Sequence, residues 1–338
     1  MKRQTFRRIT LAIIVTMIAA FLSACGGGNS AGSDGKVKMK IGYLLVMDDA
    51  QAILADEAGI YEKHGLDVEM VQFSSGTDLI KGIVSGQLDA GVLGFSNALT
   101  YAAQGAGLKV VGGAQMGFHS IIVPADSDIE SVEDLKGKRL ASQKQGSTAD
   151  IVLNGVTFAE AGLVREDVNM VYVSPAQAIQ SLEGGAVDAA FVFEPFDKIA
   201  TARIGAKRIY EIGEVWPFPC MVVITSDDVL KNNQEAVNRM LDAQKEAIEM
   251  LENEPAKAAE YLAPVFIEGD ELETPTGVVK ATEIIEQSIS SQEFNWALDE
   301  EDINRMQELA DIMLEQNILE KAVKVSDILD LSWQEAQL

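Results

Sequence analysis

Two stretches of this chain recur about one hundred residues further along, and this internal repeat constrains the fold more than any other feature. The run LDVEMV at residues 66–71 is matched by DVNMV at residues 167–171. The run IKGIVSGQLDA at residues 80–90 is matched, 99 residues later, by IQSLEGGAVDA at residues 179–189. Solenoid repeats span roughly 20–50 residues, so this period is too long for a solenoid and has the size of a domain. The sequence therefore predicts that one strand–helix–strand unit occurs twice, in two similar lobes.

Apolar runs and amphipathic stretches alternate within each copy of the repeat. We predict strands at residues 38–45, 67–73, 90–95, 139–142, 169–173 and 188–193, with helices at residues 50–58, 78–85, 149–161 and 176–183. Strands that alternate with helices form mostly parallel sheets covered on both faces. The predicted fold class is therefore α/β, with two lobes that each contain a mostly parallel sheet flanked by helices.

The chain changes character after Asp227 and becomes largely helical, with no strand signal beyond Ile224. Apolar residues recur there at helical spacing, which predicts helices packed on a lobe that is already formed. We expect the chain to cross between lobes near residues 119–124 and again near residues 219–225. The predicted organisation is listed by residue number: lobe 1 at 37–119 plus 222–338, with the helical C-terminal tail packed on it, and lobe 2 at 120–221.

The first residues have the layout of an export signal. Four basic residues within positions 2–8 precede an uncharged apolar run at residues 9–22, which is short for a membrane span. The run ends in LSAC, which resembles the bacterial lipobox, so residues 1–24 are predicted to be a lipoprotein signal peptide and Cys25 the site of lipidation. An uncleaved anchor helix, or an ordinary signal with a chance cysteine, is the alternative. Residues 25–36 are rich in Gly and Ser and are expected to act as a flexible tether.

The chain is strongly acidic, with 27 basic and 52 acidic residues and a net charge of −25. Removal of the predicted signal would lower this charge to −29, because the signal contains four basic residues and no acidic ones. Such a charge disfavours nucleic acid and anionic headgroups as partners, so membrane contact is expected through the lipid anchor only. Cys25 and Cys220 are the two cysteines, and if Cys25 is lipidated no disulfide framework is possible.

Candidate ligand-binding residues lie in the loops that follow the predicted strands, because ligands of parallel sheets bind beyond the carboxyl ends of the strands. These loops contain hydrogen-bonding, aromatic and acidic side chains, and Lys144 is their one basic residue. The predicted ligand-binding residues are Asp48, Ser75, Thr77, Ser96 and Asn97 in lobe 1, and Gln145, Ser147, Thr148, Glu194 and Phe196 in lobe 2. Each also has a structural interpretation: Asp48 can cap a helix, Phe196 can belong to the core and Glu194 can face water.

Motifs of catalysis and of metal binding are absent from the sequence. The chain has two histidines, no His-Glu-x-x-His, no Gly-x-Ser-x-Gly and no phosphate-binding loop. We therefore predict no catalytic residue, no metal site and no cofactor. The competing hypothesis is an enzyme that uses Asp48, Glu194 and His119 as acid and base.

Several motifs carry a family resemblance. They are IESVEDLKGKR at 129–139, QGS at 145–147, GAVDA at 185–189, AGIYEKHGLDV at 58–68 and GQLD at 86–89. With them the chain resembles periplasmic solute-binding proteins of the nitrate, sulfonate, taurine and thiamine-pyrimidine group. The resemblance implies a two-lobe type II fold with a hinge, ligand-driven closure, and docking on an ABC importer. Some relatives act in pyrimidine biosynthesis and carry a Cys-rich run; this sequence lacks that run, so the activity is not carried over.

These observations predict an extracytoplasmic, lipid-anchored solute-binding protein. Aromatic and acidic loops favour a neutral or cationic small molecule, such as a pyrimidine- or flavin-like solute. The alternative is an anionic solute such as an aliphatic sulfonate, taurine or nitrate, held by backbone amides at a helix start near Ser147. The expected partners are the solute and an ABC permease with its ATPase, and the protein is expected to be a monomer. A surface receptor without an importer is a third possibility.

Overall fold

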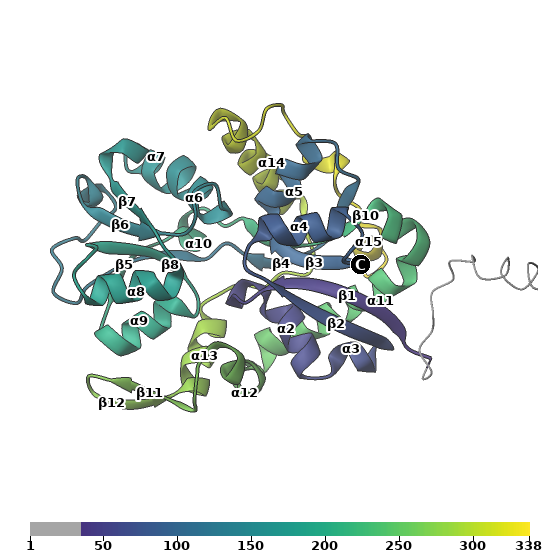
Figure 1. Ribbon diagram of the computed structural model, residues 1–338, viewed down its shortest axis with the longest axis horizontal. Helices are drawn as coiled ribbons and strands as arrows, with labels where there is room; N and C mark the ends of the chain where they lie inside the picture. The colour runs from purple at the N-terminus through teal and green to yellow at the C-terminus, as the bar shows by residue number, and fades with distance from the viewer. Residues whose placement is uncertain (1–34) are drawn as a thin grey trace, which may run out of the picture.

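The computed structural model describes residues 35–338, and these residues form two α/β lobes that lie side by side (Figure 1). The sheet of the first lobe has five strands in the order β2-β1-β3-β10-β4. Its strands are β1 (Val37–Leu44), β2 (Leu66–Phe73), β3 (Ala90–Gly94), β4 (Leu108–Met116) and β10 (Pro219–Ser226). Only β10 runs against the other four strands of this sheet, because it pairs antiparallel with both β3 and β4.

The sheet of the second lobe repeats this arrangement in the order β7-β6-β8-β5-β9. Its strands are β5 (His119–Val123), β6 (Arg139–Ser142), β7 (Asn169–Tyr172), β8 (Ala189–Phe193) and β9 (Lys207–Glu211). Again one inserted strand, β5, is antiparallel to both of its neighbours. The prediction of two lobes with mostly parallel sheets is therefore confirmed.

The internal repeat reflects one hydrogen-bonding device used in both sheets. Asp89 comes just before β3, and its carboxylate accepts the backbone N–H of Lys40 at 2.7 Å. Asp188 lies 99 residues later, just before β8, and accepts the backbone N–H of Arg139 at 2.7 Å. In each copy a glycine at positive φ, Gly86 or Gly185, follows the C-cap of the preceding helix. The repeated Gly-x-x-Asp run therefore ties the end of a helix to the neighbouring parallel strand.

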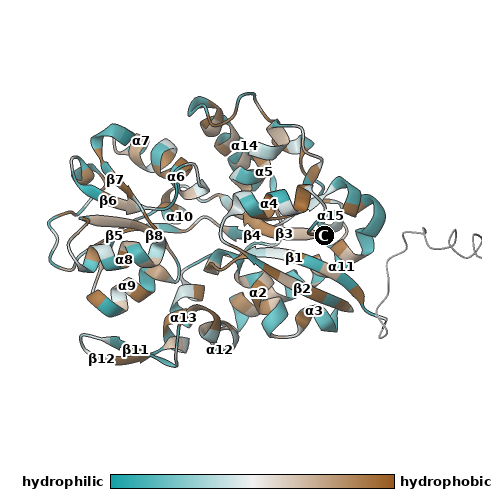
Figure 2. Cartoon of the chain, in the orientation of Figure 1, coloured by the Kyte–Doolittle hydropathy of each residue, from teal (hydrophilic) through white to brown (hydrophobic). Residues whose placement is uncertain are grey.

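Helices cover both faces of the two sheets, and Figure 2 shows hydrophobic residues along the central strands. The helices of the two lobes are α2 (Ala50–Glu57), α3 (Ile60–Lys63), α4 (Gly76–Val84), α5 (Phe95–Ala103), α6 (Thr148–Val152), α7 (Phe158–Glu160), α8 (Pro175–Glu183), α9 (Phe196–Ile204) and α10 (Ile212–Val215). Every residue of β3, β5 and β10 is buried. Central strands buried on both faces read as continuous apolar runs. Of these three, only β3 was predicted as a strand, whereas β5 and β10 lie where the sequence predicted crossings between the lobes.

The C-terminal tail contains α11 (Asp227–Asn253), α12 (Pro255–Phe266), α13 (Ala281–Ser290), α14 (Glu300–Glu315) and α15 (Ser332–Glu335). As predicted, it packs on the first lobe, where α11 and α12 contact α2. The tail also reaches the second lobe: α13 contacts α9, and α14 contacts α6 as well as α5. Both α13 and α14 lie where the lobes meet (Figure 1).

The expectation that no strand follows Ile224 was wrong. Strands β11 (Glu271–Thr274) and β12 (Gly277–Lys280) form an antiparallel hairpin. Each strand has only four residues, too few for a strand pattern to stand out from the helical signal around it. Two residues, Pro275 and Thr276, form the turn, and Gly277 at the start of β12 has a φ of 139°, a conformation that glycine adopts readily.

The predicted lobe boundaries remain predictions, although the sheets divide the chain close to them. Strand β5 of the second sheet begins at His119, and β10 of the first sheet begins at Pro219. The predicted signal, residues 1–24, and Cys25 lie outside the described residues, as does most of the tether. Within residues 35–338, no helix is both long and apolar enough to cross a membrane.

Candidate functional site

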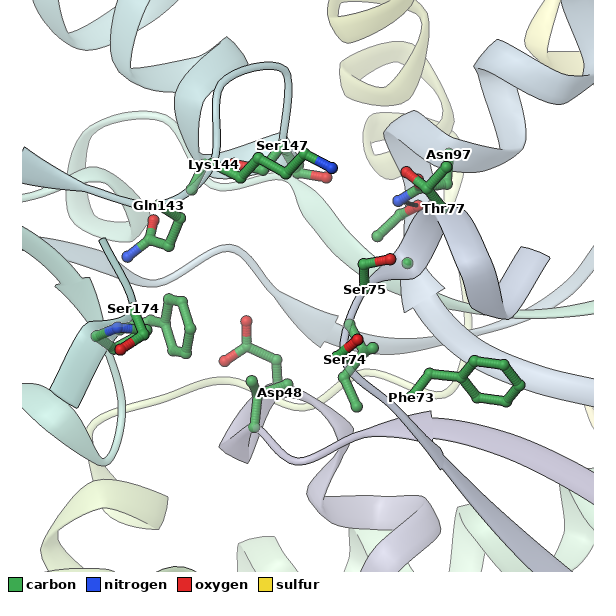
Figure 3. A pocket seen from close by; sticks show the side chains of 18 of the residues that line it. Asp48, Phe73, Ser74, Ser75, Thr77, Asn97, Gln143, Lys144, Ser147 and Ser174 are labelled. Atoms are coloured by element: carbon green, nitrogen blue, oxygen red, sulfur yellow. Dashed lines mark hydrogen bonds between the residues drawn. The ribbon is translucent and has the colours of Figure 1, made fainter. Parts of the chain in front are cut away.

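A cavity of about 810 Å³ lies between the two lobes. It opens at the carboxyl ends of β1, β2 and β3 on one side, and of β7 and β8 on the other. Loops at these strand ends and the first residues of α4, α6 and α8 form its walls. Figure 3 shows side chains from both lobes around this space, with Asp48 on the side opposite Lys144 and Ser147; we call the side with Asp48 the floor. The position agrees with the rule that ligands of such sheets bind beyond the carboxyl ends of the strands.

Most of the predicted ligand-binding residues line this cavity. They are Asp48, Ser75, Thr77, Asn97, Gln145, Ser147, Thr148 and Phe196. The structure does not bring Ser96 and Glu194 to the cavity wall, although both are buried nearby. The expectation that ligands bind beyond the carboxyl ends of the strands therefore located the right loops. It did not distinguish residues of the cavity wall from residues directly behind the wall.

Ser96 and Glu194 link parts of the chain that are distant in sequence. The hydroxyl of Ser96, in α5 of the first lobe, lies 2.6 Å from that of Thr148, at the start of α6 in the second lobe. Glu194 accepts a hydrogen bond of 2.7 Å from Ser291, just after α13, and forms an ion pair of 3.1 Å with Lys198. Both residues thus hold the second lobe against the first lobe or its tail.

Several wall residues were not among the predicted ligand-binding residues. They are Ser74, Gln143, Lys144, Tyr172, Ser174 and Phe193. One of them could have been found from the repeat, since Ser174 lies 99 residues after Ser75. Both serines cap the helix that follows: Ser75 accepts the N–H of Asp78 and Ser174 accepts that of Gln177. The other wall residues lie at or just after strand ends, and the sequence pattern did not define where these strands end.

Three helices begin at the cavity wall. The N-caps of α4, α6 and α8 are Ser75, Ser147 and Ser174, and each hydroxyl accepts a backbone N–H from its own helix. The hydroxyls of Ser75 and Ser174 also donate to side chains of their own helices, to Asp78 Oδ2 at 2.9 Å and to Gln177 Oε1 at 3.1 Å. Helix N-termini carry partial positive charge, and Lys144 adds the one ammonium group among the described wall residues.

The floor of the cavity has the opposite electrostatic character. Asp48 is the one carboxylate among the described wall residues, and its side chain is buried. Burial, and to a smaller extent the nearby carboxylate of Glu194, raises the pKa of Asp48 to about 8. Asp48 is therefore largely protonated at neutral pH when nothing else occupies the floor, and it can then donate a hydrogen bond.

His119 and Cys220 lie beside Asp48 at the floor. Cys220 Sγ is 3.7 Å from His119 Nε2, and burial lowers the pKa of His119 to about 4, so the imidazole is neutral. Burial also raises the pKa of the Cys220 thiol well above its usual range. The sequence predicted no metal site because these three positions are far apart in the chain, yet the structure brings their ligand atoms within 4.8 Å of one another.

The hypothesis of an acid–base enzyme receives little support from this geometry. Asp48 and His119 line the cavity, but Glu194 lies behind its wall and is engaged by Ser291 and Lys198. A general base must reach the proton that it removes, and Glu194 does not face the space where a substrate would lie.

Two α/β lobes that are joined by crossing strands and enclose a cavity define the periplasmic-binding-protein fold. The chain belongs to the NMT1-like family, whose model matches residues 32–265. It is 26% identical over 324 residues to a Bacillus subtilis protein named as an aliphatic sulfonates-binding protein, covering 94% of each chain.

Solved structures give the same assignment of the fold. The alkanesulfonate-binding protein SsuA from Xanthomonas axonopodis pv. citri, bound to MOPS, superposes with a TM-score of 0.72 at 25% identity, over 87% of this chain and 98% of that one. The fold also occurs in the desulfurization enzyme DSZB, with a TM-score of 0.64 at 16% identity over 88% of this chain and 98% of that one. The fold alone therefore does not decide between binding and catalysis.

Proposed function

We propose that this protein captures a neutral or cationic small solute between its two lobes and delivers it to an ABC importer. The observation that carries the proposal is the cavity itself, because both lobes contribute side chains to its wall. A solute that contacts both lobes stabilises their association through interactions that neither lobe offers alone. The similarity to named solute-binding proteins supports the same function.

The preference for a neutral or cationic solute rests on the floor and on one wall. Asp48 disfavours an anion next to it whenever the carboxyl is ionised, and it donates a hydrogen bond when it is protonated. Phe193 and Phe196 pack edge to face, with ring centroids 5.8 Å apart, and both line the cavity. Aromatic faces beside a polar floor suit a flat solute, such as a pyrimidine- or flavin-like molecule.

An anionic solute is the second candidate. Ser147 and Lys144 lie across the cavity from Asp48, and the helix starts at Ser75 and Ser174 lie to either side of it (Figure 3). A sulfonate or nitrate bound against these walls would meet partial positive charge from the helix N-termini. The names of the relatives, which refer to sulfonates, favour this candidate.

The location of the protein follows from the same proposal. An exported chain lipidated at Cys25 would be held outside the cytoplasm by its acyl anchor, with residues 25–36 as tether. Its partners would be the solute, a permease and an ATPase, and no second copy is required. Replacement of Cys25 by Ser should release the protein from membranes while solute binding in vitro is retained. Persistence of the variant in washed membranes would contradict the proposed anchor.

A thermal-melting screen tests the solute class. The purified chain would be heated with pyrimidines, flavins, aliphatic sulfonates, taurine or nitrate. A ligand at about one hundred times its dissociation constant adds roughly 2.7 kcal/mol to the free energy of unfolding. We expect a higher melting temperature with a pyrimidine or flavin, and loss of this increase in Phe196→Ala.

The control is Tyr261→Ala, because Tyr261 is an exposed aromatic residue of α12 outside the cavity. An increase seen only with sulfonates or nitrate, and lost in Lys144→Gln, would support the second candidate. No increase with any of these ligands would contradict both proposed solute classes.

A further inference from the structure

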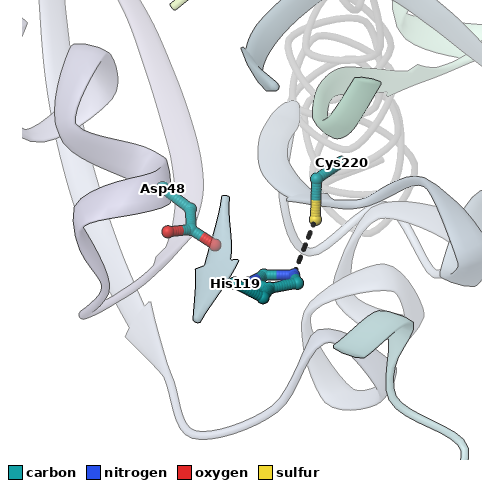
Figure 4. Close-up of side chains that lie close together, drawn as sticks. All are labelled: Asp48, His119 and Cys220. Carbon is teal, nitrogen blue, oxygen red and sulfur yellow. Dashed lines mark hydrogen bonds between the residues drawn. The ribbon is translucent and has the colours of Figure 1, made fainter. Parts of the chain in front are cut away.

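Three potential metal ligands meet at the floor of the cavity. Asp48 lies in the 3₁₀ turn Met47–Asp49 after β1, His119 is the first residue of β5, and Cys220 is the second residue of β10. The ligands therefore come from the first lobe and from the two strands that follow the crossings between lobes. Figure 4 shows the carboxylate, the imidazole and the thiol directed toward one another.

The spacing of these groups fits a tetrahedral ion. Zn–S bonds of about 2.3 Å and Zn–N bonds of about 2.0 Å place sulfur and nitrogen roughly 3.5 Å apart at a tetrahedral angle. Cys220 Sγ and His119 Nε2 are 3.7 Å apart, and all three ligand atoms lie within 4.8 Å of one another. A small adjustment of the Asp48 side chain would complete a three-ligand set.

The burial of the cluster points to a missing partner. Asp48, His119 and Cys220 have exposed fractions of only 4%, 2% and 2%. Asp48 Oδ1 is buried and has no hydrogen-bond partner. Buried polar atoms are nearly always paired, with protein groups, water or an ion, so an unpaired carboxylate oxygen in a built cluster calls for an explanation.

The three side chains also offer the ligand atoms that Zn²⁺ prefers. Zn²⁺ is bound in proteins by thiolate sulfur, imidazole nitrogen and carboxylate oxygen. A divalent ion would displace the proton of the Cys220 thiol and hold the Asp48 carboxylate in its ionised form. One thiolate and one carboxylate would balance the charge of the ion, so burial would place no net charge at the floor.

We propose that Asp48, His119 and Cys220 form a binding site for a transition-metal ion of the Zn²⁺ class. Three protein ligands would leave a fourth coordination position, and this position faces the cavity because all three residues line it. Water would fill the position in the absence of solute. If the proposed function holds, a lone pair of the solute, such as an aromatic ring nitrogen, would replace that water.

Metal titration of the full chain in a Cys25→Ser background tests this site. Cys220 is then the single thiol of the protein. Zn²⁺ would be titrated in competition with a chromophoric chelator, and Co²⁺ binding would be followed by absorption. We expect one Zn²⁺ per chain and a thiolate-to-Co²⁺ charge-transfer band. Loss of one ligand in Cys220→Ser or His119→Gln should weaken Zn²⁺ binding by at least about a hundredfold, since loss of second-shell support alone costs 10–100-fold.

The chain offers a matched control in its other histidine. His64 lies far from the cavity and pairs with Glu246 at 2.9 Å, so His64→Gln should bind Zn²⁺ as the parent does. Asp48→Asn keeps the shape of the floor and provides a second test should Cys220→Ser fold poorly. Absence of Zn²⁺ binding in the parent, or unchanged binding in the His119→Gln and Asp48→Asn variants, would overturn the proposal. Because Zn²⁺ is titrated without any solute, either result can be interpreted separately from the test of solute capture.

Discussion

The two lobes have sheets of the same topology but differ in the elements that surround these sheets. Both sheets have five strands in the same spatial order, with one inserted antiparallel strand and one aspartate that ties a helix end to the central strands. The first lobe has an additional tail from Asp227 onward, whereas the second lobe has none of its own. The repeated part of the chain therefore forms the two sheets, and the unrepeated tail determines how the two lobes contact each other.

The hydrophobic cores of the two lobes also differ, because the tail extends the core of the first lobe only. Buried residues of the first lobe and the tail form one continuous cluster, which also includes Ile151, Val152 and Val156 of the second lobe. The remaining core of the second lobe is split into two smaller clusters. Alternate residues of its central strands divide between these clusters, since successive side chains of a strand point to opposite faces. The second lobe thus depends on two thinner layers and on contacts with the tail.

The largest expected effect comes from the core of the second lobe. Phe191 in β8 is fully buried, and Phe191→Ala should lower the free energy of unfolding by about 3–5 kcal/mol. The position 99 residues earlier is Val92 in β3, where Val92→Ala removes less volume and should cost roughly half as much. Amide hydrogen exchange should show that Phe191→Ala reduces protection in β6 and β8 more than in β3 and β10. An equal loss in both sheets would mean that the lobes unfold as one unit.

Overpacking between the lobes should have the next largest effect. A Cβ at Gly155, in the π-helical turn Leu153–Thr157, would collide with Ile312 and Gln316 of α14 and the residues after it. Gly155→Ala should cost about 1–3 kcal/mol and loosen the contact of the tail with the second lobe. Urea unfolding measures the cost. Gly184→Ala is the control, because the nearest atom to its new Cβ, Gln180 O, is 3.3 Å away. Equal costs for the two variants would show that the contact with α14 has no special role.

The repeat made the fold predictable but left half of the site undetermined. Ligands of parallel sheets bind beyond the carboxyl ends of the strands, so the predicted strands located Ser75, Thr77 and Ser147 at the cavity. These residues could be found because helix starts are formed by hydrogen bonds between residues that are close in sequence. The hairpin at Glu271–Lys280 was missed because its strands are too short to show a period.

The floor could not be predicted for a different reason. Asp48, His119 and Cys220 meet only after both crossings are in place, and no spacing along the chain records that meeting. Ser96 and Glu194 were predicted to face the ligand because their loops do, although the side chains point to partners in other segments. Such long-range pairings depend on how the lobes sit together, which a local pattern does not contain.

Asp188 and Asp89, the two aspartates of the repeat, should differ by a smaller amount in their contribution to the free energy of unfolding. Asp188 accepts hydrogen bonds from the backbone N–H of Arg139 and from its guanidinium group, at 2.7 Å each for the backbone N and Nη2. The carboxylate of Asp89, at the equivalent position of the first lobe, accepts among the described residues only the backbone N–H of Lys40. Charged hydrogen bonds contribute more than neutral ones, so Asp188→Asn should cost about 1–2 kcal/mol after solvent screening, and Asp89→Asn less. Urea unfolding at neutral pH would measure both variants. A larger cost at Asp89 would show that the guanidinium contact does not stabilise the second lobe.

The smallest expected effect is the pH dependence of the Asp188 contact. Hydrogen bonds from Arg139 lower the pKa of Asp188 in the folded protein below its ordinary value of about 3.9. A carboxyl with a lowered native pKa contributes stability that is fully present above the ordinary pKa and is lost as the pH falls through the native pKa. The difference in the free energy of unfolding between the parent and Asp188→Asn should therefore be constant from about pH 5 to 7 and shrink below about pH 4. A difference that persists undiminished in acid would show that ionisation of Asp188 does not account for its contribution, and then the guanidinium contact would not distinguish the two lobes.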